Sequence, residues 1–308
     1  MRPDSQPSLA PLRLRLPATS ANLGPGFDAA AVALDFYLEI QAAPASEFSI
    51  VATGVDADRC SRINDNLILT AYLRILEAHN RPIVPLAIRM TNEIPLGMGC
   101  GSSAAGRLAA IALAAHFGGL SWTSERILEE AAALEGHPDN VAACWLGGFV
   151  AATNHTGQIV VGQVNPPQEW RAIITFPDDP VATSKARAVL PERYSRADTV
   201  TNIQAVSLLP LAFAQSRGDL LQAAMIDRIH QPYRESICPM LPLLLPLAGQ
   251  HGILGVALSG AGPAVLTVVD QEQNLPKATD AIRLAIKNLP NPQIRVCRFE
   301  PRGAALCF

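Results

Sequence analysis

A glycine- and serine-rich loop at residues 95–103 reads PLGMGCGSS and combines residue types that bind phosphate through the main chain. Glycines recur at every second position from Gly97 to Gly101, and two serines stand directly before a run rich in Ala, Leu and Ile. Glycine permits positive φ and a close approach of the backbone to a ligand, whereas serine is favoured as the N-cap of a helix. A loop that enters a helix in this way directs unpaired N–H groups and the positive end of the helix dipole at one point. That point suits a phosphate group.

The spacing separates this loop from two common nucleotide-binding patterns. No Gly-Lys-Ser/Thr follows the glycines, so the loop is not a Walker A motif. The glycines are evenly spaced and then give way to serines, which fits the GxGxxG dinucleotide pattern poorly. Residues 86–90 before the loop have the character of a strand, so strand, loop and helix follow in the right order. On this stretch alone, however, a purely structural turn is an equally good interpretation.

Two further loops place polar side chains between apolar stretches. Residues 17–28 read PATSANLGPGFD and include Asn22 and Asp28, and residues 135–140 read EGHPDN. Either loop alone is compatible with a solvated turn. Together with the glycine loop they indicate a composite active site. A later loop at residues 259–263, SGAGP, joins two short apolar runs and is either a second backbone approach to a ligand or a tight hairpin.

The composition predicts a folded protein of two domains. Of 308 residues, 49% are hydrophobic and 17% charged, which excludes a disordered chain, and a chain of this length usually divides in two. We place the boundary near residues 164–167 and the domains at residues 1–165 and 166–308.

The net charge and the cysteines limit the binding partners and the cellular compartment that the sequence predicts. A net charge of −3 gives no reason to expect nucleic acid or an anionic membrane as partner, and the sequence has neither a membrane-spanning apolar run nor a signal peptide. The six cysteines, of which Cys307 is the last, have no metal-ligand spacing. They predict reduced thiols, no zinc site and a cytoplasmic location.

The elements that must position these loops follow from hydrophobic periodicity and from helix and turn signals. Leu12, Leu14 and Leu16 alternate with arginines, as in a half-buried strand. Pro210 should kink or split the helix that contains it. We predict strands at residues 12–16, 29–40, 86–90, 170–176, 255–258, 264–269 and 294–299. We predict helices at residues 64–79, 104–117, 124–134, 202–216, 219–229 and 278–288.

The loops resemble, in order and wording, the motifs of the GHMP kinase superfamily in the form that its homoserine kinases carry. PATSANLGPGFD resembles the first motif, PLGMGCGSSAA at residues 95–105 the ATP-binding second motif, and LSGAGPAVL at residues 258–266 the third. EGHPDNVAA, TSKAR at residues 183–187 and HQPYR at residues 230–234 match homoserine kinases more closely than sibling families. Cys100 departs from the pattern, which usually has Leu. Because the loop acts through its backbone, we expect this change to leave ATP binding intact.

The resemblance implies an α+β fold of two domains, the first like ribosomal protein S5 domain 2 and the second ferredoxin-like, with the active site between them. It implies phosphorylation of L-homoserine by ATP in threonine biosynthesis, with Mg²⁺ as the metal ion, and a homodimer as the usual assembly. Two alternatives stay open: a GHMP kinase that acts on another small hydroxylated metabolite, and a non-catalytic relative that binds a nucleotide or an amino acid.

The resemblance also implies roles for individual residues. The positions of the ATP-binding motif are Pro95, Leu96, Gly97, Met98, Gly99, Cys100, Gly101, Ser102, Ser103, Ala104 and Ala105. The magnesium ligands are Ser103 and Glu135, whose oxygens suit this hard cation. The substrate-binding positions are Asn22, Asp28, His137, Asn140, Thr183, Arg187 and Arg234. Among these, Asp28 can pair with the ammonium group of an amino acid, and the two arginines with its carboxylate.

The catalytic residues implied are Asn140, Asp28 and His137. Asp28, Asp139 and His137 could each accept the hydroxyl proton. A loose phosphoryl-transfer transition state puts little demand on a base, and homoserine kinases are thought to act without a dedicated one. We predict the same for this chain.

Overall fold

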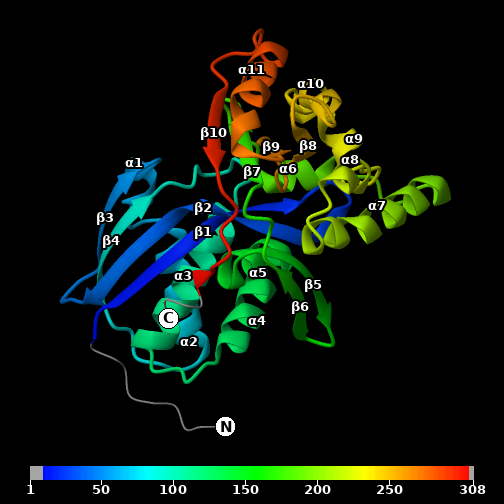
Figure 1. Cartoon of the computed structure of the whole chain (residues 1–308). Coiled ribbons are helices and arrows are strands. Elements are labelled where there is room, and N and C mark those ends of the chain that lie inside the picture. The colour runs from blue at the N-terminus through cyan, green and yellow to red at the C-terminus, as the bar shows by residue number, and fades with distance from the viewer. Residues whose placement is uncertain (1–9, 305–308) are drawn as a thin grey trace.

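The structure, a computed structural model, describes residues 10–304 and contains two β-sheets with helices packed on them (Figure 1). The chain before residue 10 and Cys307 lie outside the described residues. The first sheet has six strands in the order β3-β4-β2-β5-β6, with β1 paired to β2. They are β1 (Leu12–Asn22), β2 (Gly26–Pro44), β3 (Ser49–Gly54), β4 (Leu86–Asn92), β5 (Phe149–His155) and β6 (Gln158–Val164). The second sheet, in the order β10-β7-β9-β8, contains β7 (Arg171–Phe176), β8 (Ile253–Leu258), β9 (Val265–Val269) and β10 (Gln293–Cys297).

Helices cover one side of the first sheet, where Figure 1 shows α2 to α5 together. They are α2 (Leu67–Ala78), α3 (Ser102–Phe117), α4 (Ser124–Glu135) and α5 (Asp139–Leu146), preceded by the short α1 (Ala57–Cys60). Helices α3 and α5 contact β1 and β2, and α2 and α4 pack on α3 from outside. Most residues of α3 are buried, as expected of a helix that is apolar on all sides. Helix α3 is therefore fixed by its surroundings, and its N-terminus has a defined position.

The second half of the chain carries the long helix α7 (Arg196–Ala214), which contacts β5, and several shorter helices. The shorter helices are α6 (Thr183–Ala188), α8 (Leu221–Ala224), α9 (Gln231–Arg234), α10 (Leu241–Leu244) and α11 (Leu275–Ala285). Single 3₁₀ turns lie at Gly218–Leu220, Glu235–Ile237, Leu245–Leu247 and Glu272–Asn274. After β10 the chain returns to the first sheet, as its red trace shows in Figure 1. There Phe299 bridges Leu34, and Glu300 N donates to Ala33 O at 2.9 Å.

Most predicted elements are confirmed, and the largest differences lie beside the site. The predicted loop at residues 17–28 is mainly strand: β1 continues to Asn22, with Thr19 opposite Ala33 of β2, and leaves a turn of only three residues, 23–25. The alternation of Leu12, Leu14 and Leu16 is confirmed by their burial. Beyond Leu16 both faces of β1 are buried, so alternation stops although the strand continues. Polar residues in a buried strand therefore resembled a loop.

Three differences lie after residue 148. The β5–β6 hairpin, which turns around Gly157, was not predicted. Helix α7 starts at Arg196, capped by Ser195, before the predicted start at residue 202, and Pro210 does not split it. The predicted helix at residues 219–229 is only a 3₁₀ turn followed by α8. It ends because Asp227 accepts the N–H groups of residues 229–231 and so takes the backbone out of the helix.

Candidate active site

Main-chain hydrogen bonds hold the three motif loops together. Thr19 N donates to Cys100 O at 3.1 Å, which joins the first motif to the glycine loop, and Gly260 N donates to Ala21 O at 3.0 Å, which joins the third motif to the first. Ala264 N closes the set by donating to the glycine loop. Segments distant in sequence thus form one continuous floor.

The glycines of the loop at residues 95–103 also serve the packing of this floor. Gly99 and Gly101 have φ of 85° and 73°, as the sequence predicted. A Cβ on Gly99 would lie under 3.0 Å from the Ser259 carbonyl oxygen, and one on Gly101 would lie under 3.0 Å from the Thr19 hydroxyl. The neighbouring motifs therefore require glycine at these two positions, whose main chain lines the cleft.

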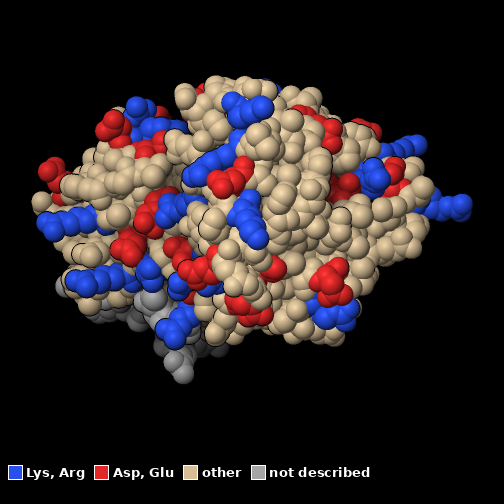
Figure 2. Space-filling model, turned by 45° about the horizontal axis from the view of Figure 1, so that its top comes forward, with Lys and Arg blue, Asp and Glu red and all other residues tan. Residues whose placement is uncertain are grey.

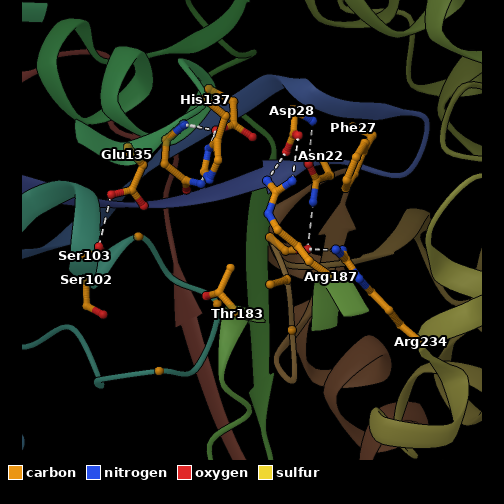
Figure 3. Close-up of a pocket in the computed structure, with 18 residues that line it drawn as sticks. Asn22, Phe27, Asp28, Ser102, Ser103, Glu135, His137, Thr183, Arg187 and Arg234 are labelled. Atoms are coloured by element: carbon orange, nitrogen blue, oxygen red, sulfur yellow. Dashed lines mark hydrogen bonds and ion pairs between the residues drawn. The ribbon is translucent and has the colours of Figure 1, made fainter. Parts of the chain in front are cut away.

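Helix α3 presents its N-terminus to the cleft. Its N-cap is Gly101 in the left-handed conformation, and the serines are its first two residues, so the expectation of a serine cap was wrong. Because they stand in the first turn, the side chains of Ser102 and Ser103 are free to face the cleft, which both line (Figure 3). The first N–H groups of a helix have no partner within it and favour an anion.

Ser103 and Glu135 form a pair of oxygen donors beside this helix end. Ser103 Oγ donates to Glu135 Oε2 at 3.0 Å (Figure 3). The same carboxylate oxygen also accepts from Arg107, which the sequence analysis did not single out although it lies one helical turn after Ser103. A hydroxyl and a carboxylate with water are a donor set that fits Mg²⁺. The residues present therefore suit the predicted metal ion.

His137, Asp139 and Asn140 form a hydrogen-bonded group at the start of α5. Asp139 is buried, and its Oδ1 lies 2.7 Å from both His137 Nδ1 and Asn140 N. Burial of the ring lowers the pKa of His137, but the hydrogen bond to Asp139 and the charges of nearby carboxylates outweigh it and hold this pKa above its ordinary value. Asn140 Oδ1 accepts from Thr19 Oγ1 at 2.6 Å. Asp139 thus orients two side chains of the cleft.

Asp28 and Arg187 meet across the cleft from the two halves of the chain. Arg187 Nη2 and Nη1 donate to Asp28 Oδ1 and Oδ2 at 2.6 and 3.0 Å, a bidentate pair that Figure 3 shows at the centre of the pocket. Asn22, buried at the end of β1, accepts from Asp28 N at 3.0 Å and donates to Gly260 O at 2.8 Å. Its amide therefore fixes the turn that carries Asp28.

His137, Asp139 and Asp28 offer ligand atoms within 4.8 Å of one another and could be taken for a metal site. Three of the four carboxylate oxygens are already engaged, however. Both oxygens of Asp28 accept from Arg187, and Asp139 Oδ1 accepts from its neighbours. Glu135 is engaged as well, by Ser103 and Arg107, but its place with Ser103 beside the N-terminus of α3, where an anion is favoured, makes these two the better donor set for a cation bound to phosphate.

Arg234 reaches the cleft from beneath. It is 1% exposed, yet it lines the cleft (Figure 3). Phe27 contacts both arginines, with the guanidinium carbons of Arg187 and Arg234 at 5.5 and 5.4 Å from its ring centre. Thr183 begins α6 on the opposite wall.

The structure brings most of the predicted site residues to one cleft. Those that line it are Asn22, Asp28, Gly97, Gly99, Gly101, Ser102, Ser103, Glu135, His137, Asn140, Thr183, Arg187 and Arg234. Cys100, Ala104 and Ala105 of the glycine motif are buried in the core instead. Phe27 was not singled out. Its place in the first motif, beside Asp28, is the only sequence signal for it.

A second cavity adjoins the first at Ser102 and Ser103. Its walls combine apolar side chains such as Leu38 and Met90 with a polar edge formed by residues 64–66. The sequence analysis interpreted these polar residues only as a helix start. Asn66 is indeed the N-cap of α2. Because capping already explained this residue, nothing in the sequence indicated that it lies beside a cavity.

Neither the described helices nor the charges on the face in Figure 2 point to a membrane or to a highly charged partner. Within residues 10–304, no helix is both long and apolar enough to span a membrane. In Figure 2 basic and acidic side chains are interspersed.

Comparison with known proteins agrees with the motifs. The models for the GHMP kinases N terminal domain and the GHMP kinases C terminal match residues 66–148 and 208–288. A homoserine kinase of Solibacter usitatus is 44% identical over 259 residues, 84% of this chain and 85% of the relative, and one of Synechococcus sp. is 36% identical over 278 residues, 89% of each. The crystal structure of homoserine kinase from Cytophaga hutchinsonii has a TM-score of 0.81 at 25% identity, covering 96% of this chain and 97% of that one. The chain therefore has the two-domain GHMP kinase fold that its motifs predicted, and it is a member of the GHMP kinase superfamily in its homoserine kinase branch.

Proposed function

We propose that this protein is a homoserine kinase, which transfers the γ-phosphoryl group of ATP to the side-chain hydroxyl of L-homoserine and yields ADP and O-phospho-L-homoserine for threonine biosynthesis. The observation that carries the proposal is the cleft itself. It places a helix N-terminus, a carboxylate–hydroxyl pair and two arginines around one space. These are the groups needed for a polyphosphate, a metal ion and an amino-acid carboxylate.

ATP fits the two adjoining cavities. The triphosphate would lie against the main chain of the glycine loop and the first turn of α3, where Ser102 and Ser103 border both cavities. The apolar second cavity with its polar edge suits a nucleoside. Ser103 and Glu135 would hold Mg²⁺, which neutralises phosphate charge when it is bound.

The amino-acid end of the substrate fits the other side of the cleft. Homoserine carries one positive and one negative group, and Asp28 and Arg187 offer the opposite charges on two facing elements. Arg234 adds a second guanidinium from below. Arginine binds carboxylates and phosphates in a bidentate manner. A pair of arginines therefore favours a substrate with an anionic group, such as an amino acid, over a neutral sugar.

The chain's own residues contribute orientation more than covalent chemistry. The hydroxyl oxygen forms a bond to the γ-phosphorus while the bond from that phosphorus to the bridging oxygen of ADP breaks, and the hydroxyl proton leaves to water or to a neighbouring group. Asp139 is buried and already accepts from His137 and Asn140. It is therefore better placed to orient them than to take the proton, which supports catalysis without a dedicated base.

The proposed setting is a homodimeric cytoplasmic enzyme with neither nucleic acid nor membrane as partner. A coupled assay of ADP release from Mg·ATP tests the function, with homoserine, mevalonate, galactose and shikimate supplied separately. Homoserine should give the highest kcat/KM. Faster turnover of another alcohol would identify the protein as a kinase of that alcohol instead. If Mg·ATP binds but no alcohol is turned over, the protein is a non-catalytic relative.

A further inference from the structure

A histidine that the reaction does not use lies directly behind the substrate arginines. His230 is 0% exposed, and its Nε2 lies 2.7 Å from Gly24 O in the turn of the first motif. Its Nδ1 lies 3.1 Å from Arg234 Nη1. The ring also stacks on Phe27, with 5.3 Å between ring centres. His230 thus connects the turn next to Asp28 with the buried guanidinium from the other half of the chain.

The two contacts of His230 define one tautomer. A carbonyl oxygen can only accept, so Nε2 must carry the hydrogen that Gly24 O receives. Arg234 can only donate, so Nδ1 must carry a lone pair. Both contacts are satisfied together only by the neutral ring protonated at Nε2. A protonated ring would place a second N–H against the guanidinium.

The charges that face His230 agree with a neutral ring. The pKa of His230 is lowered to about 4, mainly by burial and also by the charge of Arg234, against the opposing charges of Asp227 and Asp28 and the hydrogen bond to Gly24 O. Asp227 is also buried, but it accepts main-chain N–H groups of residues 229–231. These N–H groups at the start of α9 therefore stabilise the negative charge of Asp227, so a positively charged His230 ring is not needed to balance it.

Arg234 is held by neutral acceptors. Its Nε donates to Ala186 O at 3.0 Å, and its Nη1 donates to Gly260 O at 3.3 Å and to His230 Nδ1. Within residues 10–304 no carboxylate oxygen lies within 4.0 Å of this guanidinium. A buried cation without a counter-ion is unfavourable unless a ligand supplies the charge. These acceptors thus fix the orientation of the Arg234 guanidinium. They do not neutralise its positive charge, which can therefore pair with an anionic ligand.

We propose that His230 is a positioning residue for homoserine: through its Nδ1 lone pair it orients the Arg234 guanidinium toward the substrate carboxylate, and its Nε2–H, which donates to Gly24 O, holds the ring in the tautomer that leaves Nδ1 free to accept. This inference rests on the proposed function. It predicts that loss of the Nδ1 acceptor weakens homoserine binding and leaves the nucleotide site unchanged.

Two conservative variants separate the contacts. In His230→Asn the amide oxygen takes the place of Nδ1 and can still accept from Arg234, whereas in His230→Gln the amide nitrogen takes the place of Nε2 and can still donate to Gly24 O. Asn202→Ala is the matched control. Asn202 is also buried, and it holds the same turn by donating to Pro25 O at 3.1 Å.

Steady-state kinetics should divide the variants. We expect His230→Gln to raise the KM for homoserine on the order of 10- to 100-fold, the effect of one hydrogen bond to a charged group, with kcat and the KM for ATP changed by less than about threefold. His230→Asn should stay within about threefold of the wild type, and so should Asn202→Ala. The proposal is overturned if the Gln variant keeps the wild-type KM, or if either of the other two variants matches its increase.

A second measurement needs neither activity nor a variant. Nitrogen-15 NMR of the imidazole at pH 7 should show His230 as the neutral tautomer protonated at Nε2. A ring protonated at Nδ1, or at both nitrogens, would overturn the proposal even if the variants failed to fold. If the wild type does not phosphorylate homoserine, the proposed function fails, and the tautomer still decides whether His230 serves Arg234.

Discussion

Replacing Gly99 by alanine tests whether the glycine loop is shaped by its protein neighbours. A Cβ at this position would fall under 3.0 Å from two backbone oxygens, those of Ser259 and Gly262. Gly97 provides a matched control in the same loop. Its φ of 74° is close to the 85° of Gly99, but its added Cβ would meet only Pro180 Cβ, at 3.2 Å.

The expected magnitudes follow from these two environments. An L-residue in the left-handed conformation is unfavourable by about 1–2 kcal/mol, and this term is common to both variants. Crowding in a packed interior adds about 1–3 kcal/mol, and it applies in full only at Gly99, where the obstacles are main-chain atoms. We therefore expect Gly97→Ala to lower the free energy of unfolding by about 1–2 kcal/mol and Gly99→Ala by about 2–5 kcal/mol.

Urea unfolding of both variants measures the difference, with the KM for ATP as a second readout. Since Gly99 joins the glycine loop to the third motif, its substitution should also raise the KM for ATP. Equal destabilisation by the two substitutions would show that the approach of these loops does not set the glycine requirement. The argument for a pre-formed floor would then be wrong.

Three further predictions concern charged or titratable side chains. Asp139→Asn should lower kcat by no more than about tenfold, the effect of one lost hydrogen bond to His137; loss of all turnover with both KM values unchanged would identify Asp139 as the base. In EDTA, Arg107→Met should lower the free energy of unfolding by about 1 kcal/mol. Added Mg²⁺ should stabilise the variant more than the wild type, because the cation then replaces the guanidinium beside Glu135. Equal stabilisation of the two proteins by Mg²⁺ would contradict this. Because the folded pKa of His230 is about 4 and its ordinary value is 6.5, the unfolded chain binds a proton that the folded chain does not, and the free energy of unfolding should fall by up to about 3 kcal/mol as pH falls through this window. Urea titrations between pH 7 and 5 should show a flatter dependence for His230→Asn, and an unchanged slope would refute the shift.

The sequence predicted the elements whose signals are local. Helix α2 was predicted from apolar spacing after a polar start, and its cap, Asn66, accepts from Ile68 N and Leu69 N. The predicted end of the helix at residue 117 is confirmed, and the residue that follows, Gly118, is the C-cap of α3. A strand that is buried on both faces lacks the alternation of apolar and polar residues. For this reason the part of β1 after Leu16 was predicted as a loop. Pro210 does not split helix α7, because the helix is retained by packing rather than by the propensity of its residues.

The candidate site divides in the same way. Residue types and the resemblance indicated Asp28, Glu135 and Arg234, but not what holds them. Arg107 could not be paired with Glu135 from the sequence, since the two are on different helices and meet only when α3 packs on α4. The role of His230 was hidden likewise, because its partners are a turn and a guanidinium that come together only in the folded chain.

Cys100 shows how far the main chain alone would make the proposed phosphate site. Its side chain departs from the family pattern, but it is 1% exposed and points into the core, while its carbonyl oxygen accepts from Thr19 N. Burial raises the pKa of its thiol to about 12, so it is protonated at neutral pH and is no nucleophile. Residue 100 therefore affects the loop only by filling core volume, and a change from leucine to cysteine alters packing rather than ligand contacts. Variation at such a position is limited by the core, whereas variation at Gly99 is limited by the approach of another loop.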